Sequence, residues 1–243
     1  MGKLSFNNFS HLAKKSNSLL EISGRNQLMK EEEKNIIPDI NRKLELTKDH
    51  KLLDIGCGAG NITIFLMGKV KHITANDSKE CLDLFKSRID SYDKISFIPG
   101  NFLDIENLGK FDRILCYSVL QYLADEKEIF IFIEKALESL APGGKALFAD
   151  IPNVSKKERF LKSNYGKKID KEYRLLLKDV QKSKEDVNFP EKDEDLVQFD
   201  DDLVLRILKE TRADGYHSYV LDQSTDLCLG HTREDILIDK LED

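Results

Sequence analysis

The 243-residue chain is predicted to fold as an α/β protein, with a mostly parallel sheet covered by helices on both faces. Between residues 51 and 151, short apolar runs alternate with stretches at helical spacing, as in buried parallel strands joined by crossover helices. Three glycines follow the first run, as in a tight turn between strand and helix. The last two apolar runs, 216–222 and 233–241, have no helical crossover between them, so the final strand is expected to be antiparallel.

Strands and helices are expected in alternation along this core. The expected strands are 51–55, 70–77, 95–100, 111–117, 145–151, 216–222 and 233–241. The expected helices are 61–70, 78–90, 125–140 and 202–215, the third of them stopped by the sequence Pro142-Gly143-Gly144. Right-handed crossovers would bring the carboxyl ends of the parallel strands to one edge of the sheet, where ligands bind.

Helical segments are expected on either side of this alternation. The predicted segments are 1–48 (N-terminal helical cap), 49–152 (ligand-binding core), 153–202 (charged helical insertion) and 203–243 (completion of the sheet). Pro38 predicts a kink or boundary in the cap. The insertion has nine Lys or Arg against three Asp or Glu in 153–178, and three against ten in 179–202. It is either a solvated excursion whose halves attract each other or a lid whose basic half meets an anionic substrate.

Composition disfavours several classes of protein. Charged residues make up 34% of the chain, the net charge is −6 and the pI is about 5.5, so a protein that grips a nucleic-acid backbone is not expected. No apolar run approaches the roughly 18 residues of a membrane span, and the amino terminus lacks the apolar core of a signal peptide. The four cysteines have no C-x-x-C spacing, so no metal site is expected, and the cytoplasm is the expected location.

The strongest chemical signal is the sequence LLDIGCGAGNIT, which includes the end of the first strand. Gly56, Gly58 and Gly60 permit positive φ and let a ligand lie against the backbone, and the following helix offers free N–H groups. The dinucleotide fingerprint would need a glycine where Asn61 stands. Asp54 would repel a pyrophosphate and could accept from an ammonium, so the expected ligand is zwitterionic.

Polar and aromatic residues follow the next three strands. Asp77 ends the second strand, where a carboxylate can accept both hydroxyls of a ribose. After the third strand, Asn101 could bond an adenine edge and Phe102 could stack on its face. Tyr117 and Tyr122 flank the break after the fourth strand, across the ligand from the glycine turn. Together these features describe a site for S-adenosylmethionine.

The chain resembles the class I S-adenosylmethionine-dependent methyltransferases in five motifs that occur in family order. They are LDIGCGAG (53–60), the acid of ANDS (75–78), GNFLDI (100–105), FDRILCYSVLQYL (111–123) and APGGKALFADI (141–151). The resemblance implies a Rossmann-like, seven-stranded sheet with an antiparallel seventh strand. It also implies cofactor contacts at the amino-acid end (Asp54, Gly56, Gly58), the ribose (Asp77) and the adenine (Asn101, Phe102).

Two further features bear on the substrate. The Asn/Asp-Pro-Pro-Tyr motif of methyltransferases that act on nucleobase amines is replaced by CYSVLQYL after the fourth strand, which disfavours a nucleic-acid substrate. The segment DIPNVSKKERF, at 150–160, resembles methyltransferases of bacterial surface-glycan and small-metabolite pathways.

Candidate site residues follow from these motifs. The candidate cofactor contacts are Arg25, Asp54, Gly56, Cys57, Gly58, Asn61, Asp77, Ser78, Asn101, Phe102, Tyr117, Ser118 and Tyr122. The candidate catalytic residues are Asp150, Tyr122 and His217. Asp150 ends the fifth strand at the ligand edge, whereas His217 opens the sixth strand and would need an adjacent loop to bring it near. Each could instead be a structural polar group.

The function implied by the resemblance is SN2 transfer of a methyl group from S-adenosylmethionine to an oxygen or nitrogen, with S-adenosylhomocysteine as product. Alignment of the reactants would supply most of the acceleration. The basic stretch of the insertion favours a small anionic acceptor, such as a sugar or nucleotide-sugar, with no nucleic-acid or membrane partner. Two alternatives stay open: an RNA or protein methyltransferase, and a non-catalytic S-adenosylmethionine-binding partner protein.

Overall fold

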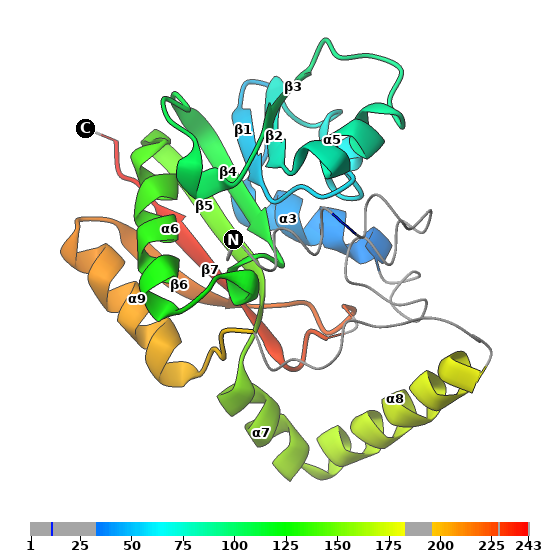
Figure 1. Cartoon of the computed structure of the whole chain (residues 1–243). Coiled ribbons are helices and arrows are strands. Elements are labelled where there is room, and N and C mark those ends of the chain that lie inside the picture. Colours follow the sequence, from blue (N-terminus) through cyan, green and yellow to red (C-terminus); the bar gives the residue numbers. More distant parts are fainter. Residues whose placement is uncertain (1–10, 12–32, 183–195, 228, 243) are drawn as a thin grey trace.

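The computed structural model describes residues 11, 33–182, 196–227 and 229–242, and its core is a seven-stranded sheet with strand order β3-β2-β1-β4-β5-β7-β6 (Figure 1). The strands are β1 (Lys51–Ile55), β2 (His72–Asp77), β3 (Ile95–Pro99), β4 (Phe111–Tyr117), β5 (Leu140–Pro152), β6 (His217–Asp222) and β7 (Arg233–Asp239). The first five strands pair in parallel, and β7 is antiparallel to both β5 and β6. The predicted Rossmann-like sheet with an antiparallel last strand is therefore confirmed.

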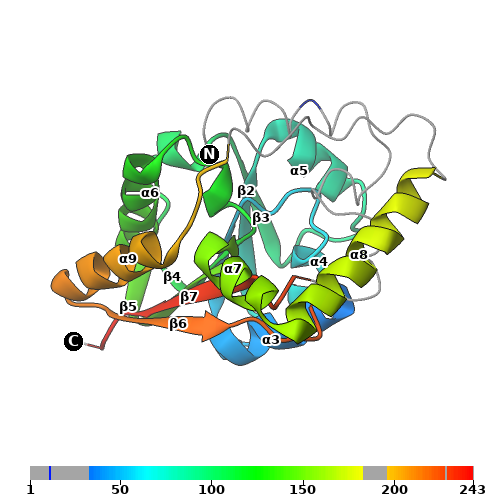
Figure 2. The same ribbon diagram turned by 90° about the horizontal axis from the view of Figure 1, so that it is seen from below.

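Helices cover both faces of the sheet because successive side chains of a strand point to opposite sides. The helices are η2 (Glu33–Asn35), α3 (Ile36–Leu44), α4 (Thr63–Leu66), α5 (Lys79–Lys86), η3 (Phe102–Asp104), η4 (Leu120–Tyr122), α6 (Glu126–Glu138), α7 (Val154–Lys162), α8 (Asn164–Lys182) and α9 (Asp201–Ala213). Leu53 of β1 belongs to the core that includes α6 and α9, whereas Leu52 belongs to the core that includes α3 and α5. Figure 2 shows α9 and α3 on opposite sides of β6 and β7.

Three elements differ in detail from the expected ones. The helix expected over 61–70 is reduced to the single turn of α4, and Gly68, a poor helix former, lies in the part that is not helical. β5 begins at Leu140 and so includes the Pro-Gly-Gly sequence, with a register irregularity opposite β4. Pro38 lies in the first turn of α3, where its missing N–H is not needed, and the boundary expected near it is at Ile36.

Residues 153–182 of the insertion form a two-helix arm beyond the carboxyl end of β5 (Figure 1). α8 packs mainly on α7 rather than on the sheet. Arg159 of α7 is ion-paired with Asp201 of α9, which is one contact between the basic and the acidic halves. The division into four segments remains a prediction. None of the helices in the described ranges is both long and apolar enough to cross a membrane.

Candidate functional site

The glycine turn joins β1 to α4 at the carboxyl edge of the sheet. Gly56, Gly58 and Gly60 all have positive φ, of 74°, 57° and 78°. The N–H groups of Gly56 and Cys57 donate to the Asn76 carbonyl at the end of β2, with N–O distances of 2.9 and 3.2 Å. The turn is therefore anchored to the neighbouring strand through its backbone, which leaves its shape independent of most side chains.

Packing requires glycine at two of these positions. A Cβ atom on Gly56 would lie 2.5 Å from a methyl group of Val119, and one on Gly60 would lie 2.5 Å from the ring of Phe85. A Cβ atom on Gly58 would meet no atom of the described residues within 4 Å. Gly58 therefore presents open backbone with left-handed φ, which is the form of surface against which a ligand can lie.

Asp54 lies beneath the turn and is 3% exposed. Its Oδ2 accepts from the Thr63 hydroxyl of α4 at 2.7 Å. Burial raises the pKa of Asp54 to about 7, the Thr63 bond acts in the opposite direction, and the charge of Asp77 adds to the rise. A cation placed nearby would stabilise the ionised form, so this carboxyl suits an ammonium or sulfonium ligand.

Asp77 connects the end of β2 to the glycine turn. Its Oδ2 accepts from the Gly58 N–H at 2.8 Å and its Oδ1 from the Ser78 N–H at 2.6 Å. Burial raises the pKa of Asp77, and these two N–H donors oppose that rise. The Ser78 hydroxyl accepts from the Cys81 N–H and caps α5. Asp77 thus has a structural role in the turn in addition to any ligand that it accepts.

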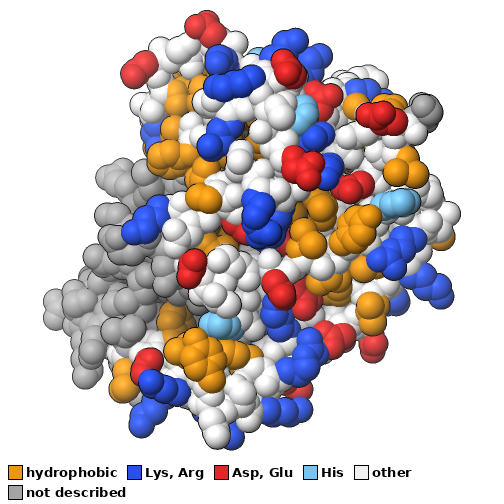
Figure 3. All heavy atoms as spheres, turned by 180° about the vertical axis from the view of Figure 1, so that it is seen from behind, with side chains coloured by type: hydrophobic (Ala, Val, Ile, Leu, Met, Phe, Trp, Pro, Cys, Tyr) orange, Lys and Arg blue, Asp and Glu red, His pale blue; other side chains and the backbone are white. Residues whose placement is uncertain are grey.

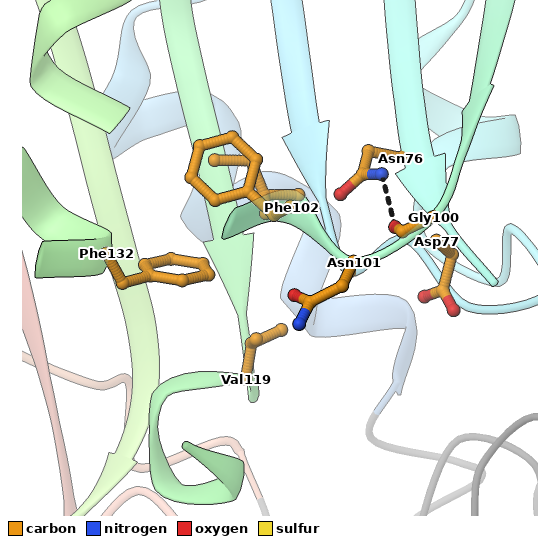
Figure 4. Close-up of a pocket in the computed structure, with 9 residues that line it drawn as sticks. Asn76, Asp77, Gly100, Asn101, Phe102, Val119 and Phe132 are labelled. Atoms are coloured by element: carbon orange, nitrogen blue, oxygen red, sulfur yellow. Dashed lines mark hydrogen bonds between the residues drawn. The ribbon is translucent and has the colours of Figure 1, made fainter. Parts of the chain in front are cut away.

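A small pocket opens beside the turn, at the ends of β1 and β2 (Figure 4). Its walls include Asp77, Gly100, Asn101 and Val119. Asn101 caps η3, since its Oδ1 accepts from the Leu103 N–H at 3.3 Å. The pocket has a volume of about 10 Å³, which is room for about one water molecule. An adenine ring would therefore lie at the mouth of the pocket.

Phe102 lines this pocket and belongs to the hydrophobic core. Its side chain packs against Phe132 of α6, with ring centroids 4.8 Å apart, and Lys135 Nζ lies 5.6 Å from its ring centroid. The residue is only 3% exposed. Stacking of Phe102 on an adenine would require this ring to move, and its predicted cofactor contact stays a prediction.

Two neighbouring strands end in non-glycine residues with positive φ. Ser118, after β4, has φ of 60°, and Asp150, near the end of β5, has φ of 61°. The Ser118 N–H donates to the Ala149 carbonyl at 2.8 Å, and Gln121 Nε2 donates to the Ser118 hydroxyl at 3.0 Å. Such conformations cost free energy and concentrate at functional sites. The residue before Ser118 is Tyr117, a predicted cofactor contact, and it is buried at the end of β4.

The Asp150 side chain is held by residues from far along the chain. Gln223 Nε2 donates to its Oδ1 at 3.3 Å, and Arg233 Nε lies 3.4 Å from the same oxygen. Arg233 also donates to the Asp150 carbonyl at 2.8 Å, and the Asp150 N–H donates to Asp235 Oδ1 at 2.9 Å. Asp150 therefore lies at the predicted edge, as one member of an ionic network.

Other predicted site residues lie elsewhere. His217 is at the amino end of β6, paired in register with Asp239, and β6 runs parallel to β5. The structure therefore puts His217 at the opposite edge of the sheet, and its prediction as a catalytic residue is wrong. Asn61 is close to the turn and accepts from Arg88 at 2.7 Å. Arg25 lies outside the described residues. Tyr122 is half-buried in η4, on the side of the ligand edge near Ser118.

Three residues of the site, Gln223, Arg233 and Asp235, were not predicted from the sequence. They follow β6 or lie in β7, and no local motif marks them. The pairing of β7 with β5 brings them to Asp150. Within the described residues, no group of three or more His, Cys, Asp or Glu side chains has an arrangement that could hold a metal ion.

Comparisons with known proteins match the core. Residues 52–144 match the model of the methyltransferase domain family. The chain is similar to nodulation protein S of Rhizobium tropici, with 31% identity over 97 residues, 40% of this chain and 41% of that protein. It is also similar to a ubiquinone biosynthesis O-methyltransferase of Rickettsia bellii, with 24% identity over 129 residues, 50% of each chain.

Among solved structures, the N-methyltransferase NodS of Bradyrhizobium japonicum, in complex with S-adenosylhomocysteine, has a similar fold. The TM-score is 0.61 at 16% identity, over 98% of this chain and 99% of that one. At this identity the likeness concerns the fold alone. The chain matches the curated relatives named above over only 41–50% of their own lengths.

Proposed function

From the premise that residues 52–144 form a class I S-adenosylmethionine-dependent methyltransferase domain, we propose that the protein transfers a methyl group from S-adenosylmethionine to an oxygen or nitrogen of a small molecule. The observation that carries the proposal is the glycine turn, with open backbone at Gly58 between two buried carboxylates, Asp54 and Asp77. This arrangement suits a ligand that has both a cationic amino-acid end and a ribose.

The residues present fit the cofactor in three places. The Asp54 carboxyl would accept a hydrogen bond from the ammonium group at the amino-acid end of the cofactor. The backbone of Gly56 and Gly58 would lie against the same end of the cofactor. Asp77, already fixed by two N–H donors, would accept from the ribose hydroxyls. Asn101 would meet the adenine at the mouth of the pocket. The bound cofactor supplies an activated methyl group on its sulfonium.

The acceptor side of the proposal involves the ends of β4 and β5. Asp150 and Tyr122 are the candidate residues for binding or deprotonating the acceptor, beside the left-handed Ser118. In this role, the Asp150 carboxylate would keep its contacts with Gln223 and Arg233. Because transfer by SN2 needs the acceptor atom in line with the methyl group, fixed orientation of these side chains is their main contribution.

The chemical class of the acceptor is the finer part of the proposal. The basic stretch favours an anionic acceptor, such as a sugar phosphate or nucleotide-sugar. Lys156 and Arg159, however, are already ion-paired, with Asp222 and Asp201. On the face in Figure 3, Lys and Arg are interspersed with Asp and Glu rather than gathered into one basic surface. An anionic acceptor would therefore rely on the exposed lysines Lys157, Lys167, Lys168 and Lys171.

Calorimetric titration with S-adenosylhomocysteine tests the cofactor part. We expect Asp77→Ala to weaken binding by at least about tenfold, because the ribose hydroxyls and the Gly58 N–H lose their acceptor. Asp83→Ala is the control, because Asp83 is an exposed residue of α5 that pairs with Lys79. No binding by the wild-type protein, or equal binding by the two variants, would contradict the proposal.

Turnover assays on a panel of small hydroxyl and amine compounds test the acceptor part. For an acceptor that reacts, we expect Lys157→Glu to raise KM for anionic compounds and to leave KM for neutral ones unchanged. If Lys157→Glu changed KM for anionic and neutral compounds equally, the proposed preference for an anionic acceptor would be contradicted. Binding of the cofactor with no turnover across the panel would favour a non-catalytic binding protein.

A further inference from the structure

A chain of buried charges connects α3 to the end of β5. Lys43 Nζ donates to Asp39 Oδ2 and to Asp235 Oδ2, both at 2.6 Å. The second oxygen of Asp235 accepts from the Asp150 N–H at 2.9 Å. The Lys43 and Asp235 side chains are each only 1% exposed, and that of Asp39 is 6% exposed. The exposed Arg42 neutralises Asp39 from the outside.

This network is a poor device for stability alone. Taking three charges out of water costs free energy that their attraction often fails to recover, and apolar side chains of similar size are frequently as stable. Burial also raises the pKa of Asp235, and the charge of the adjacent Lys43 opposes that rise. A buried network of this kind is better explained by a need for one particular geometry.

The geometry that it fixes is that of Asp150. This residue has φ of 61°, a conformation that a residue with a Cβ atom rarely adopts without support. Asp235 supports it through the N–H, and Arg233 supports it through the carbonyl. Both of the peptide groups that flank the Asp150 α-carbon are thereby tied to β7, in addition to the contacts that the carboxylate itself makes with Gln223 and Arg233.

We propose that Lys43 and Asp235 are positioning residues, which act through the Asp150 backbone to orient this carboxylate at the methyl-transfer site. The proposal rests on the proposed function for the role of Asp150 in transfer. Lys43 holds one Asp235 oxygen so that the other faces the Asp150 N–H, and neither residue needs to touch substrate. Docking of α3 against β7 thereby becomes part of the construction of the acceptor side.

Two variants test whether Lys43 and Asp235 position Asp150 or only stabilise the fold. Lys43→Met/Asp235→Leu replaces the ion pair by apolar side chains of similar size, and Asp235→Asn keeps the shape but places an amide beside Lys43. Thr211→Val is the control, because Thr211 is a buried residue of α9 whose hydroxyl bonds to Ser218 at the other edge of the sheet. It perturbs the fold without touching Asp150.

The first measurement is the exchange rate of the Asp150 amide in aspartate-labelled protein, followed by NMR. We expect exchange to rise about tenfold or more in both variants, since a charge-assisted bond is lost or weakened. Thr211→Val should leave the exchange of this amide, relative to global unfolding, unchanged. An Asp150 amide that keeps its protection in both variants would overturn the proposal.

The second measurement is methyl transfer with an acceptor that the wild-type protein uses. We expect kcat to fall about tenfold or more in both variants, while the affinity for S-adenosylhomocysteine changes by less than about twofold. Unchanged kcat in a variant whose Asp150 amide has lost protection would contradict a role in positioning. A wild-type protein without turnover would count against the proposed function, and amide exchange would still decide whether Lys43 and Asp235 hold Asp150.

Discussion

The two halves of the candidate site are built by different means. On the cofactor side, the contacts join residues close in sequence, such as Asp54 with Thr63 and Gly58 with Asp77, which are 9 and 19 positions apart. On the acceptor side, Asp150 contacts residues 73 to 85 positions away, and Lys43 reaches Asp235 across 192 positions.

The difference explains why the first half has a recognisable motif and the second has none. A turn anchored by its backbone needs glycines at fixed spacing, so its shape is written into a short sequence. A side-chain network needs only that distant strands meet in register, and many sequences can satisfy that condition. Perturbing the two halves should therefore have different consequences for stability and for binding.

Gly56→Ala should have the largest effect, because it disrupts the glycine turn on the cofactor side of the site. The alanine would have unfavourable φ and its Cβ would clash with Val119, so we expect a stability loss of about 2–5 kcal/mol. Binding of S-adenosylhomocysteine should be lost at the same time. Chemical denaturation and calorimetry measure the two effects.

Two matched variants separate the stability loss due to the unfavourable φ from the loss due to the clash with Val119. Gly215→Ala has a similar positive φ but no atom within 4 Å of its Cβ, so it should lose only about 1–2 kcal/mol and keep binding. Val119→Ala, added to Gly56→Ala, should recover the part due to the clash. If Gly56→Ala proved no worse than Gly215→Ala, close packing of the turn would not be the reason for its glycine.

Asp54 should make stability depend on pH on the cofactor side. Its folded pKa of about 7 lies above its ordinary value of 3.8, so ionisation destabilises the folded state. The free energy of unfolding should therefore fall as pH rises from about 4 to 7, by a few kcal/mol. Asp54→Asn should lose this component. Parallel denaturation series at pH 5 and pH 8 measure the difference, and equal slopes for the two proteins would contradict it.

The same carboxyl should link cofactor binding to proton release. A cationic ligand favours the ionised form of Asp54, so affinity for S-adenosylhomocysteine should rise with pH up to about 7, by at most tenfold per unit. Calorimetry at pH 6 in buffers of different ionisation enthalpy would detect the released proton. Asp54→Asn should bind more weakly and without this pH dependence.

Arg159→Ala should have the smallest effect and tests the arm on the acceptor side. Its partner Asp201 is also exposed to solvent, and such pairs contribute little in water. We expect the thermal midpoint to stay within about 2 °C of the wild type. A large drop would mean that the arm is an integral part of the fold rather than a solvated excursion.

Much of the fold was predictable from sequence because its signals are local. The alternation of buried strands and helices predicted the sheet, and the missing crossover before β7 predicted its direction. The break after Tyr117 was also expected, and it coincides with the positive φ of Ser118. His217 was expected to need an adjacent loop to reach the ligand edge, and the structure keeps it at the amino end of β6, paired in register with Asp239.

The amino-acid sequence by itself determined the turn from Asp54 to Gly60 and the acid at the end of β2, because backbone conformation and close packing restrict the residues that can stand there. Only the tertiary structure decided how Asp150 is oriented. Arg233 and Asp235, which bond to Asp150, and Lys43, which bonds to Asp235, come together when α3 and β7 dock on β5. The energy of buried charges depends on distances that no local pattern encodes.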